Sequence, residues 1–229
     1  MIKRIVMAAA LAGLMFGADK ETERLQNCAQ VLGEVMGAPD DAIPSELLAR
    51  AECVAVVPGV KKAAFGVGGR FGRGAVSCRR GEKGGGPWGP PSMLTVGGGS
   101  FGLQLGGQSS DVVMLVMNRK GVDHLLRDKF TLGGDASAAA GPKGRSAAAS
   151  TDLLMRAEIL TYARTRGLFA GVSLDGAVVK PDNDGNKRLY GKPVPAKDLL
   201  TQGSQGIPAA AQPLIQALTK YAPRNVSAK

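Results

Sequence analysis

Apolar residues recur at helical spacing close to the start of the chain. Between Thr22 and Gly37 they stand at Leu25, Cys28, Leu32, Val35 and Met36. This periodicity predicts one amphipathic helix over residues 20–36, ended by Gly37 and Pro39. Its apolar face belongs either on a protein core or on a membrane surface. A second, short helix is expected in the stretch AIPSELLARA that follows, with Pro44 at its start.

The pattern then changes to short, valine-rich apolar runs separated by glycine. The stretch CVAVVPGVKKAAFGVGGRFGRGAVSC is interrupted by Pro58-Gly59 and by Gly72, and further on Phe101, Leu103 and Leu105 alternate with small or polar residues. Short runs bounded by turn residues are typical of consecutive antiparallel strands. We therefore expect the middle of the chain to form a β-sheet.

The last part of the chain mixes both patterns. RKGVDHLLRDKF reads as a short helix, residues 133–150 as a loop, and the segments on either side of Gly167 as strands. The tail IPAAAQPLIQALTKYA predicts a helix that Pro213 starts or interrupts. At 229 residues without an internal repeat, the chain is expected to be a single α+β domain: an antiparallel β-rich core flanked by N- and C-terminal helices.

The first residues, MIKRIVMAAALAGLMFGA, combine the basic Lys3 and Arg4 with an apolar run from Ile5 to Phe16. That run is too short to span a bilayer comfortably and is typical of a secretory signal. We expect a signal peptide at residues 1–18 and a mature domain at residues 19–229, exported to the periplasm or cell envelope. Because Phe16 is bulky where a small residue is preferred, an uncleaved anchor remains the alternative.

Candidate catalytic chemistry is scarce. GGGSFG (residues 97–102) matches two glycine motifs, GxGxxG and GxSxG, but a strand-like LQLGGQ follows where both motifs need a helix. His124 is the single histidine, without a partner at metal spacing, and is expected to be a surface or satisfied residue. DNDGN (residues 182–186) lacks the later glutamate of a calcium loop and reads as a turn. We expect no enzyme activity, no metal and no cofactor.

The chain holds three cysteines, of which at most two can pair within it. Cys53 and Cys78 both fall in expected strands, so a disulfide between them is plausible in an exported protein. Two small buried thiols are the equally good alternative.

The net charge of +10 directs attention to anionic partners. Residues 68–92 concentrate Arg70, Arg73, Arg79 and Arg80 among glycines and include Trp88. Such a segment suits nucleic acid, an anionic membrane, or solvent alone. Nucleic acid is not expected as a partner, because no recognition helix and no paired strand aromatics are evident.

Four motifs in order are similar to the SYLF domain: residues 43–79 (IPSELLARAECVAVVPGVKKAAFGVGGRFGRGAVSCR), GPWGPPSMLTVGGGSFGLQLGGQSSDVVMLVMN, LGGDASAAAGPKGR and RGLFAGVSLDGAVVKPDNDGNKRLYG. This resemblance covers most of residues 19–229. It implies a non-enzymatic lipid-binding module, related to eukaryotic proteins that bind phosphoinositide membranes and, in some cases, actin. Actin is not expected as a partner if the chain is exported.

The resemblance also implies site residues. They are Lys61 and Lys62, Arg70 and Arg73, and Lys143 and Arg145, to which we add the neighbouring Arg79 and Arg80. Trp88 is expected either to dip into a bilayer or to anchor its loop by packing. The function expected is recognition of anionic phospholipid headgroups by one basic patch; a structural envelope protein or a nucleic-acid-binding basic protein is the alternative.

Overall fold

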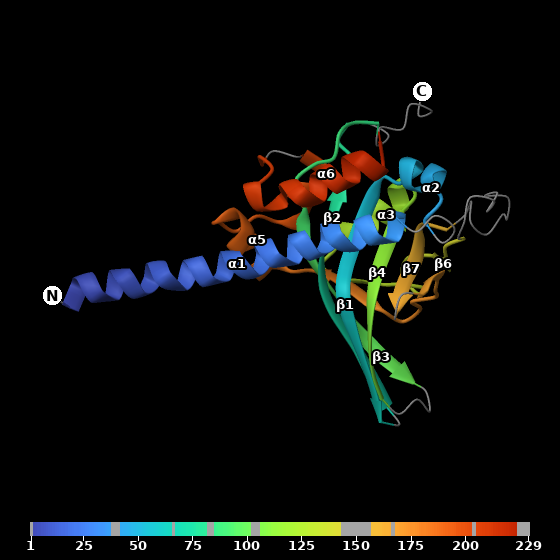
Figure 1. Ribbon diagram of the computed structural model, residues 1–229, viewed down its shortest axis with the longest axis horizontal. Coiled ribbons are helices and arrows are strands. Elements are labelled where there is room, and N and C mark those ends of the chain that lie inside the picture. Colours follow the sequence, from blue (N-terminus) through green and yellow to red (C-terminus); the bar gives the residue numbers. More distant parts are fainter. Residues whose placement is uncertain are drawn as a thin grey trace.

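The computed structural model describes residues 2–37, 42–65, 67–81, 85–101, 106–142, 157–165, 168–202 and 205–223. Its centre is a strongly curved sheet (Figure 1). The strands are β1 (Cys53–Phe65), β2 (Val67–Cys78), β3 (Ser92–Phe101), β4 (Gly106–Val116), β5 (Phe130–Thr131), β6 (Ala138–Ala140), β7 (Ile159–Thr165), β8 (Leu168–Gly171) and β9 (Val178–Pro181). Their order is β5-β9-β3-β2-β1-β4-β7-β6, with β8 also paired to β7.

The expected α+β domain with an antiparallel core is confirmed. All strand pairs between the named strands are antiparallel except β6 with β7. The helices are α1 (Ile2–Gly37), α2 (Ser45–Arg50), α3 (Arg119–Leu125), α5 (Asn183–Tyr190) and α6 (Gln212–Tyr221), with shorter turns η2 (Asp198–Gln202) and η3 (Ala209–Ala211). Strands on both sides of Gly167 and a final helix with Pro213 in its first turn agree with the sequence pattern.

Two interruptions expected within the sheet are wrong. Pro58-Gly59 lies inside β1, where the register with β4 shifts between Val57 and Val60, so the pair forms a bulge rather than a turn. Gly72 lies inside β2, and a Cβ there would come within 2.8 Å of Val57 and 2.7 Å of Val60. Gly72 therefore permits close approach of the bulge side chains and does not end a strand.

Helix α1 is longer than its apolar pattern predicts, because it begins at Ile2 and not at residue 20. Its buried residues Leu25, Cys28, Val31, Leu32 and Val35 pack in one core with β1 and α6. Figure 1 shows this part of α1 crossing the sheet beside α6, while its beginning extends away from the molecule. The apolar face of the helix thus packs on the core, which was one of the two alternatives.

Helix α5 was not expected, since DNDGN reads as a turn. The Asp182 carboxylate accepts a hydrogen bond from Gly185 N at 2.9 Å and caps the helix, which ends at Gly191 with φ of 70°. Asn186, within α5, connects the helix to β3 by two hydrogen bonds. It accepts one from Met93 N at 2.7 Å and donates one to Ser92 Oγ at 3.1 Å. A capping aspartate is the signal that identifies this short helix.

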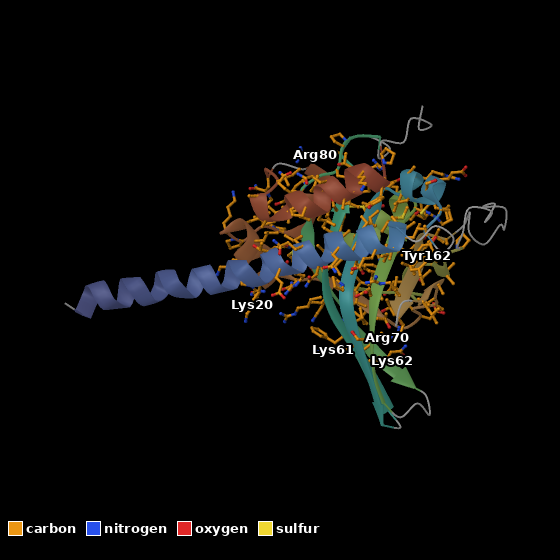
Figure 2. The ribbon with its side chains drawn as sticks, in the orientation of Figure 1. Lys20, Lys61, Lys62, Arg70, Arg80 and Tyr162 are labelled. Carbon is orange, nitrogen blue, oxygen red and sulfur yellow. A yellow bond between two sulfur atoms is a disulfide. The ribbon has the colours of Figure 1, made fainter. Side chains whose placement is uncertain are left out.

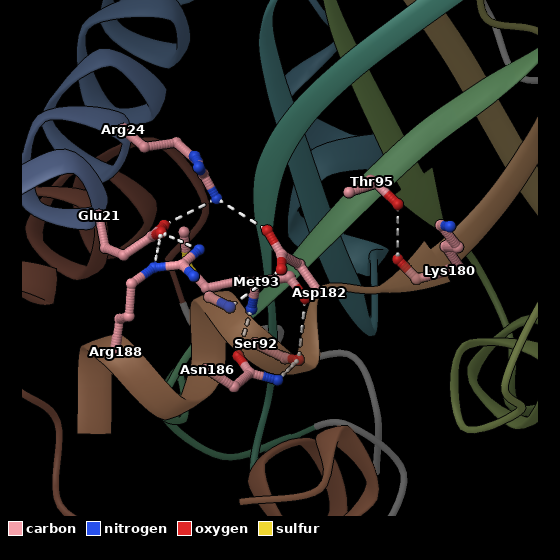
Figure 3. A network of polar contacts seen from close by, with 10 residues as sticks. Glu21, Arg24, Ser92, Met93, Thr95, Lys180, Asp182, Asn186 and Arg188 are labelled. Carbon is pink, nitrogen blue, oxygen red and sulfur yellow. Dashed lines mark hydrogen bonds and ion pairs between the residues drawn. The ribbon is translucent and has the colours of Figure 1, made fainter. Parts of the chain in front are cut away.

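Charged side chains join α1 to α5 (Figure 3). Glu21, which is fully buried, accepts from Arg188 at 2.7 Å and pairs with Arg24 at 2.7 Å, while Arg24 also reaches Asp182 at 3.2 Å. At the other end of the helix Arg164 of β7 pairs with both Glu34 of α1 and Asp111 of β4. Helix α1 is therefore held at two points by ion pairs and between them by apolar packing.

Candidate functional site

The sheet register divides the basic residues of the β1–β2 hairpin between two faces. Residues directly opposite each other in an antiparallel pair share a face, and neighbours along a strand alternate. Lys61 pairs with Phe71, whereas Lys62 pairs with Arg70. Lys61 and Phe71 consequently lie on one face and Lys62 and Arg70 on the other.

The face that carries Lys61 is the one that α1 covers further along the sheet, and we call it the α1 face. Val56 and Ala75 are opposite each other on this face and belong to the core beneath α1. Arg73 follows Ala75 at a spacing of two residues, so it shares the face with Phe71. The Arg73 guanidinium carbon lies 5.7 Å from the centre of the Phe71 ring, which agrees with this assignment.

Lys180 joins the α1 face from a distant part of the chain. Arg73 is opposite Thr95 of β3, and Thr95 is in turn opposite Lys180 of β9. The Thr95 hydroxyl donates to the Lys180 carbonyl at 3.5 Å (Figure 3). The three residues form one row across three strands, so an exposed lysine that sequence reasoning missed lies beside the basic hairpin.

The basic side chains on the α1 face are accessible to a ligand, because they are exposed and form no ion pair with a described residue. Lys61, Arg73 and Lys180 are exposed, and Phe71 is 52% exposed, one of two large apolar side chains so exposed in the described part of the chain. Neither these three cations nor Lys62 and Arg70 form an ion pair with any residue that the structure describes. Thus no carboxylate in the described part of the chain neutralises their charge.

Arg79 is not part of the expected basic surface, and Trp88 packs inside the protein, because both side chains are buried. Their exposed fractions are 6% and 4%. The Arg79 guanidinium lies 4.2 Å from the Trp88 ring and donates to the carbonyls of Ala51 at 3.2 Å and of Ala222 at 2.8 Å. Trp88 Nε1 donates to the same Ala222 carbonyl at 3.1 Å. These side chains fasten the ends of α2 and α6 to the sheet and are closed to a bilayer; Trp88 anchors its loop by packing.

Arg80 is also separated from the hairpin. It lies at the opposite end of the molecule from Lys61, Lys62 and Arg70 (Figure 2) and donates to the Gln205 carbonyl at 3.4 Å. Lys143 and Arg145 fall outside the described residues. The single basic patch expected from the sequence is therefore wrong for Arg79 and Arg80, and its hairpin part is split between two faces.

A polar groove of about 350 Å³ lies where α1 meets the bulge of β1. Arg164 lines it between Glu34 and Asp111, and Gly59 N donates to Asp111 at 2.9 Å. A hydrogen bond from Gln30 and the neighbouring Arg164 lower the pKa of Glu34. Because the three charged groups satisfy one another, the groove supports the base of the hairpin rather than offering a free charge to a ligand.

The candidate catalytic residues do not meet. The imidazole of His124 is buried, with Nε2 at 3.3 Å from Glu158, and faces the Phe130 ring at 5.9 Å between centres. Ser100 lies near the end of β3, away from this pair in the sheet order. Among the described residues no cluster of histidine, cysteine or carboxylate has metal-binding geometry.

The structure joins Cys53 and Cys78 in a disulfide and leaves Cys28 as a buried thiol.

Within the described part of the chain, no helix has both the length and the hydropathy needed to cross a bilayer.

Comparison with known proteins places the chain among relatives of one kind. Residues 97–221 match the family model Ysc84, described as Las17-binding protein actin regulator. An SH3 domain-containing protein of Schizosaccharomyces pombe is 37% identical over 188 residues, covering 81% of this chain and 42% of the relative. The human SH3 domain-containing YSC84-like protein 1 is 34% identical, covering 80% and 52%, and the Saccharomyces cerevisiae protein YSC84 is 34% identical, covering 82% and 40%.

The chain thus spans about half the length of these relatives. The family model covers more than half of the chain, from the second half of β3 to the end of α6. The chain belongs to the Ysc84, or SYLF, family.

Proposed function

We propose that the chain is a non-enzymatic peripheral membrane protein that binds anionic phospholipid headgroups with its basic hairpin. The observation that carries the proposal is the row of cations that the register assembles on the α1 face. Lys61, Arg73 and Lys180 surround the exposed Phe71 without carboxylate partners among the described residues. Cations around an exposed aromatic ring suit the boundary between headgroups and water.

The size of the effect fits reversible attachment. Each lysine or arginine close to an anionic surface contributes about 1 kcal/mol. Five such residues, counting Lys62 and Arg70 on the reverse face, would hold the protein on a charged membrane while allowing it to dissociate as salt rises. Neutral membranes should be bound poorly.

Binding to sedimented vesicles tests the proposal. The double variant Lys61→Ala, Arg73→Ala should bind phosphatidylglycerol vesicles about thirtyfold more weakly at low salt, the equivalent of about 2 kcal/mol. The exposed pair Lys192 and Lys197, changed together to alanine, is the charge-matched control and should lose little. Equal losses in the two doubles would mean that only net charge matters, and full binding to phosphatidylcholine in high salt would refute the electrostatic mechanism.

We also propose that the chain is exported and cleaved near Ala18. The basic start and short apolar run support this, as does a disulfide, which persists in oxidising compartments. Cleavage near Ala18 would leave in place the buried residues of α1 from Glu21 onward that contact the core. The packed part of the helix would remain in the mature protein.

A protein partner is the second candidate, favoured by the family description as a Las17-binding actin regulator. The hairpin cations would then face an acidic protein surface. Co-sedimentation with actin filaments, together with failure to bind anionic vesicles, would favour this role over lipid binding.

A further inference from the structure

The face of the β1–β2 hairpin opposite the α1 face, which we call the reverse face, carries two cations directly opposite each other. Lys62 of β1 is the register partner of Arg70 of β2 (Figure 2). Like charges at such positions destabilise a sheet, because the Cβ atoms lie only about 4.5–5.5 Å apart. An anion held between the two side chains would remove this repulsion.

The row that contains this pair crosses four strands. Lys62 is opposite Gln108 of β4, and Arg70 is opposite Gly98 of β3. Residues directly opposite each other share a face, so all four lie on the reverse face. A Cβ at Gly98 would lie 2.8 Å from the Gly176 carbonyl oxygen, so the loop between β8 and β9 closes that end of the row. The exposed amide of Gln108 lies at the other end.

No carboxylate among the described residues pairs with these two cations. Asp111 of β4 belongs to the α1 face, where it pairs with Arg164. Asp175, in the loop beside Gly98, accepts from the Ser173 hydroxyl at 2.6 Å. Toward the centre of the sheet the reverse face continues with uncharged residues, namely Ser110, Val60, Gly72 and Val96.

Arg70 also has a donor without an acceptor. Its side chain is half-buried, and its Nε atom is buried without a hydrogen-bond partner among the described residues. A buried donor that lacks a partner is costly, above all on a charged group, and such atoms commonly mark the place of a water or an ion. The planar guanidinium presents its Nε–H and one Nη–H as a fork that fits two oxygens of a phosphate.

We infer that Lys62 and Arg70 together bind one phosphate monoester group on the reverse face. This inference rests on the proposed function, in which the two residues otherwise add only to the general positive charge. A phosphate monoester carries a charge of about −1.5 to −2 at neutral pH, so it neutralises both cations. The single charge of a phosphodiester leaves one of them unpaired. The site therefore favours the headgroup of phosphatidic acid, or a free monoester, over the diester of phosphatidylglycerol.

Titration with glycerol 3-phosphate tests the site without a membrane. In NMR spectra of the ¹⁵N-labelled full chain, the Nε–H signal of Arg70, identified by its loss in Arg70→Lys, should move and saturate. Dimethyl phosphate, a diester, should bind about tenfold more weakly, because one charge pair is lost.

The alternation of faces supplies a matched control. Lys62→Gln should weaken the binding of glycerol 3-phosphate about tenfold. Lys61→Gln removes the same charge from the adjacent residue on the α1 face and should change it less than about twofold. Without ligand, Lys62→Gln should unfold at the same or a higher temperature, since it removes one of two opposed cations.

Vesicles identify the source of the monoester. Phosphatidic acid and phosphatidylglycerol vesicles are compared at equal surface charge. A preference of about tenfold for phosphatidic acid, lost in Lys62→Gln and kept in Lys61→Gln, would identify a lipid headgroup. Equal binding to the two kinds of vesicle, together with saturable binding of glycerol 3-phosphate, would identify a free monoester.

Three outcomes would overturn the inference while the proposed function stands: no movement of the Arg70 signal, a movement that sodium chloride of equal ionic strength reproduces, or equal effects of Lys62→Gln and Lys61→Gln on the titration. Failure of the unaltered chain to bind any anionic vesicle, with the titration intact, would refute the proposed function instead and leave the free monoester as the ligand of the site.

Discussion

Arg79 shows at the scale of one residue how a basic run can serve the fold instead of a ligand. Its guanidinium is buried against Trp88 and donates to carbonyls at the ends of α2 and α6. Burial lowers the pKa of Arg79, but at neutral pH the group stays charged. Carbonyls at helix C-termini carry partial negative charge, so this cation is placed where the helices favour it.

Replacing Arg79 by alanine should lower the free energy of unfolding by about 3 kcal/mol, because buried carbonyls lose a charged donor. The change is measured by thermal or urea denaturation. Arg80→Ala, which removes one long hydrogen bond to Gln205, is the control and should cost less than about 1 kcal/mol. Arg79→Lys should also destabilise, since a single ammonium lacks the fork that reaches both helix ends. Equal stability of the Arg79 and Arg80 variants would contradict this role.

At the scale of elements, α1 is fixed to the sheet by contacts of two kinds. Cys28 Sγ donates to the Val56 carbonyl at 3.3 Å in the apolar middle of the contact. Burial raises the pKa of this thiol to about 12, so it is protonated and shielded as long as α1 stays in place. Reactivity of Cys28 therefore reports separation of α1 from the sheet.

Glu21→Ala should release the beginning of this contact. Loss of the carboxylate leaves Arg24 and the half-exposed Arg188 without their shared partner, and we expect a cost of about 2 kcal/mol. If opening of α1 limits access, Cys28 should react with a thiol reagent at pH 8 about thirtyfold faster. Glu23→Ala, at an exposed position of the same helix, is the control. Unchanged reactivity in the Glu21 variant would show that the ion pairs do not hold α1.

At the scale of the whole molecule, the disulfide connects the fold to the compartment. Cys53 and Cys78 are 25 residues apart, and closing a loop of that length stabilises a protein by about 3 kcal/mol in the chain-entropy account. In a reducing compartment this contribution would be absent.

Protein recovered from its source cells should therefore begin near Asp19 and contain one oxidised cysteine pair. Mass spectrometry with and without thiol alkylation measures both. Reduction, or the double variant Cys53→Ser, Cys78→Ser, should lower the free energy of unfolding by about 3 kcal/mol. An intact Met1 with three free thiols would contradict export and leave a cytoplasmic partner as the better hypothesis.

The sequence by itself determined most of the local elements and the family. Helical spacing identified the packed part of α1, and Pro44 and Pro213 marked the beginnings of α2 and α6. These features depend on neighbours within one or two turns, so periodicity and proline geometry suffice. Four ordered motifs were enough to identify the SYLF family, which the family model confirms.

Only the tertiary structure decided which residues share a surface. Arg73 lies inside β2 and Arg79 directly after its end, yet the first is exposed and the second is bonded to the ends of α2 and α6. Lys180 joins Arg73 through Thr95 although it is far away in the chain. The bulge at Pro58-Gly59 sets which face Lys61 takes, because in a strand a shift of one residue exchanges the two faces. Pairing between distant strands is invisible to local pattern, and it alone placed the cations on both faces of the β1–β2 hairpin.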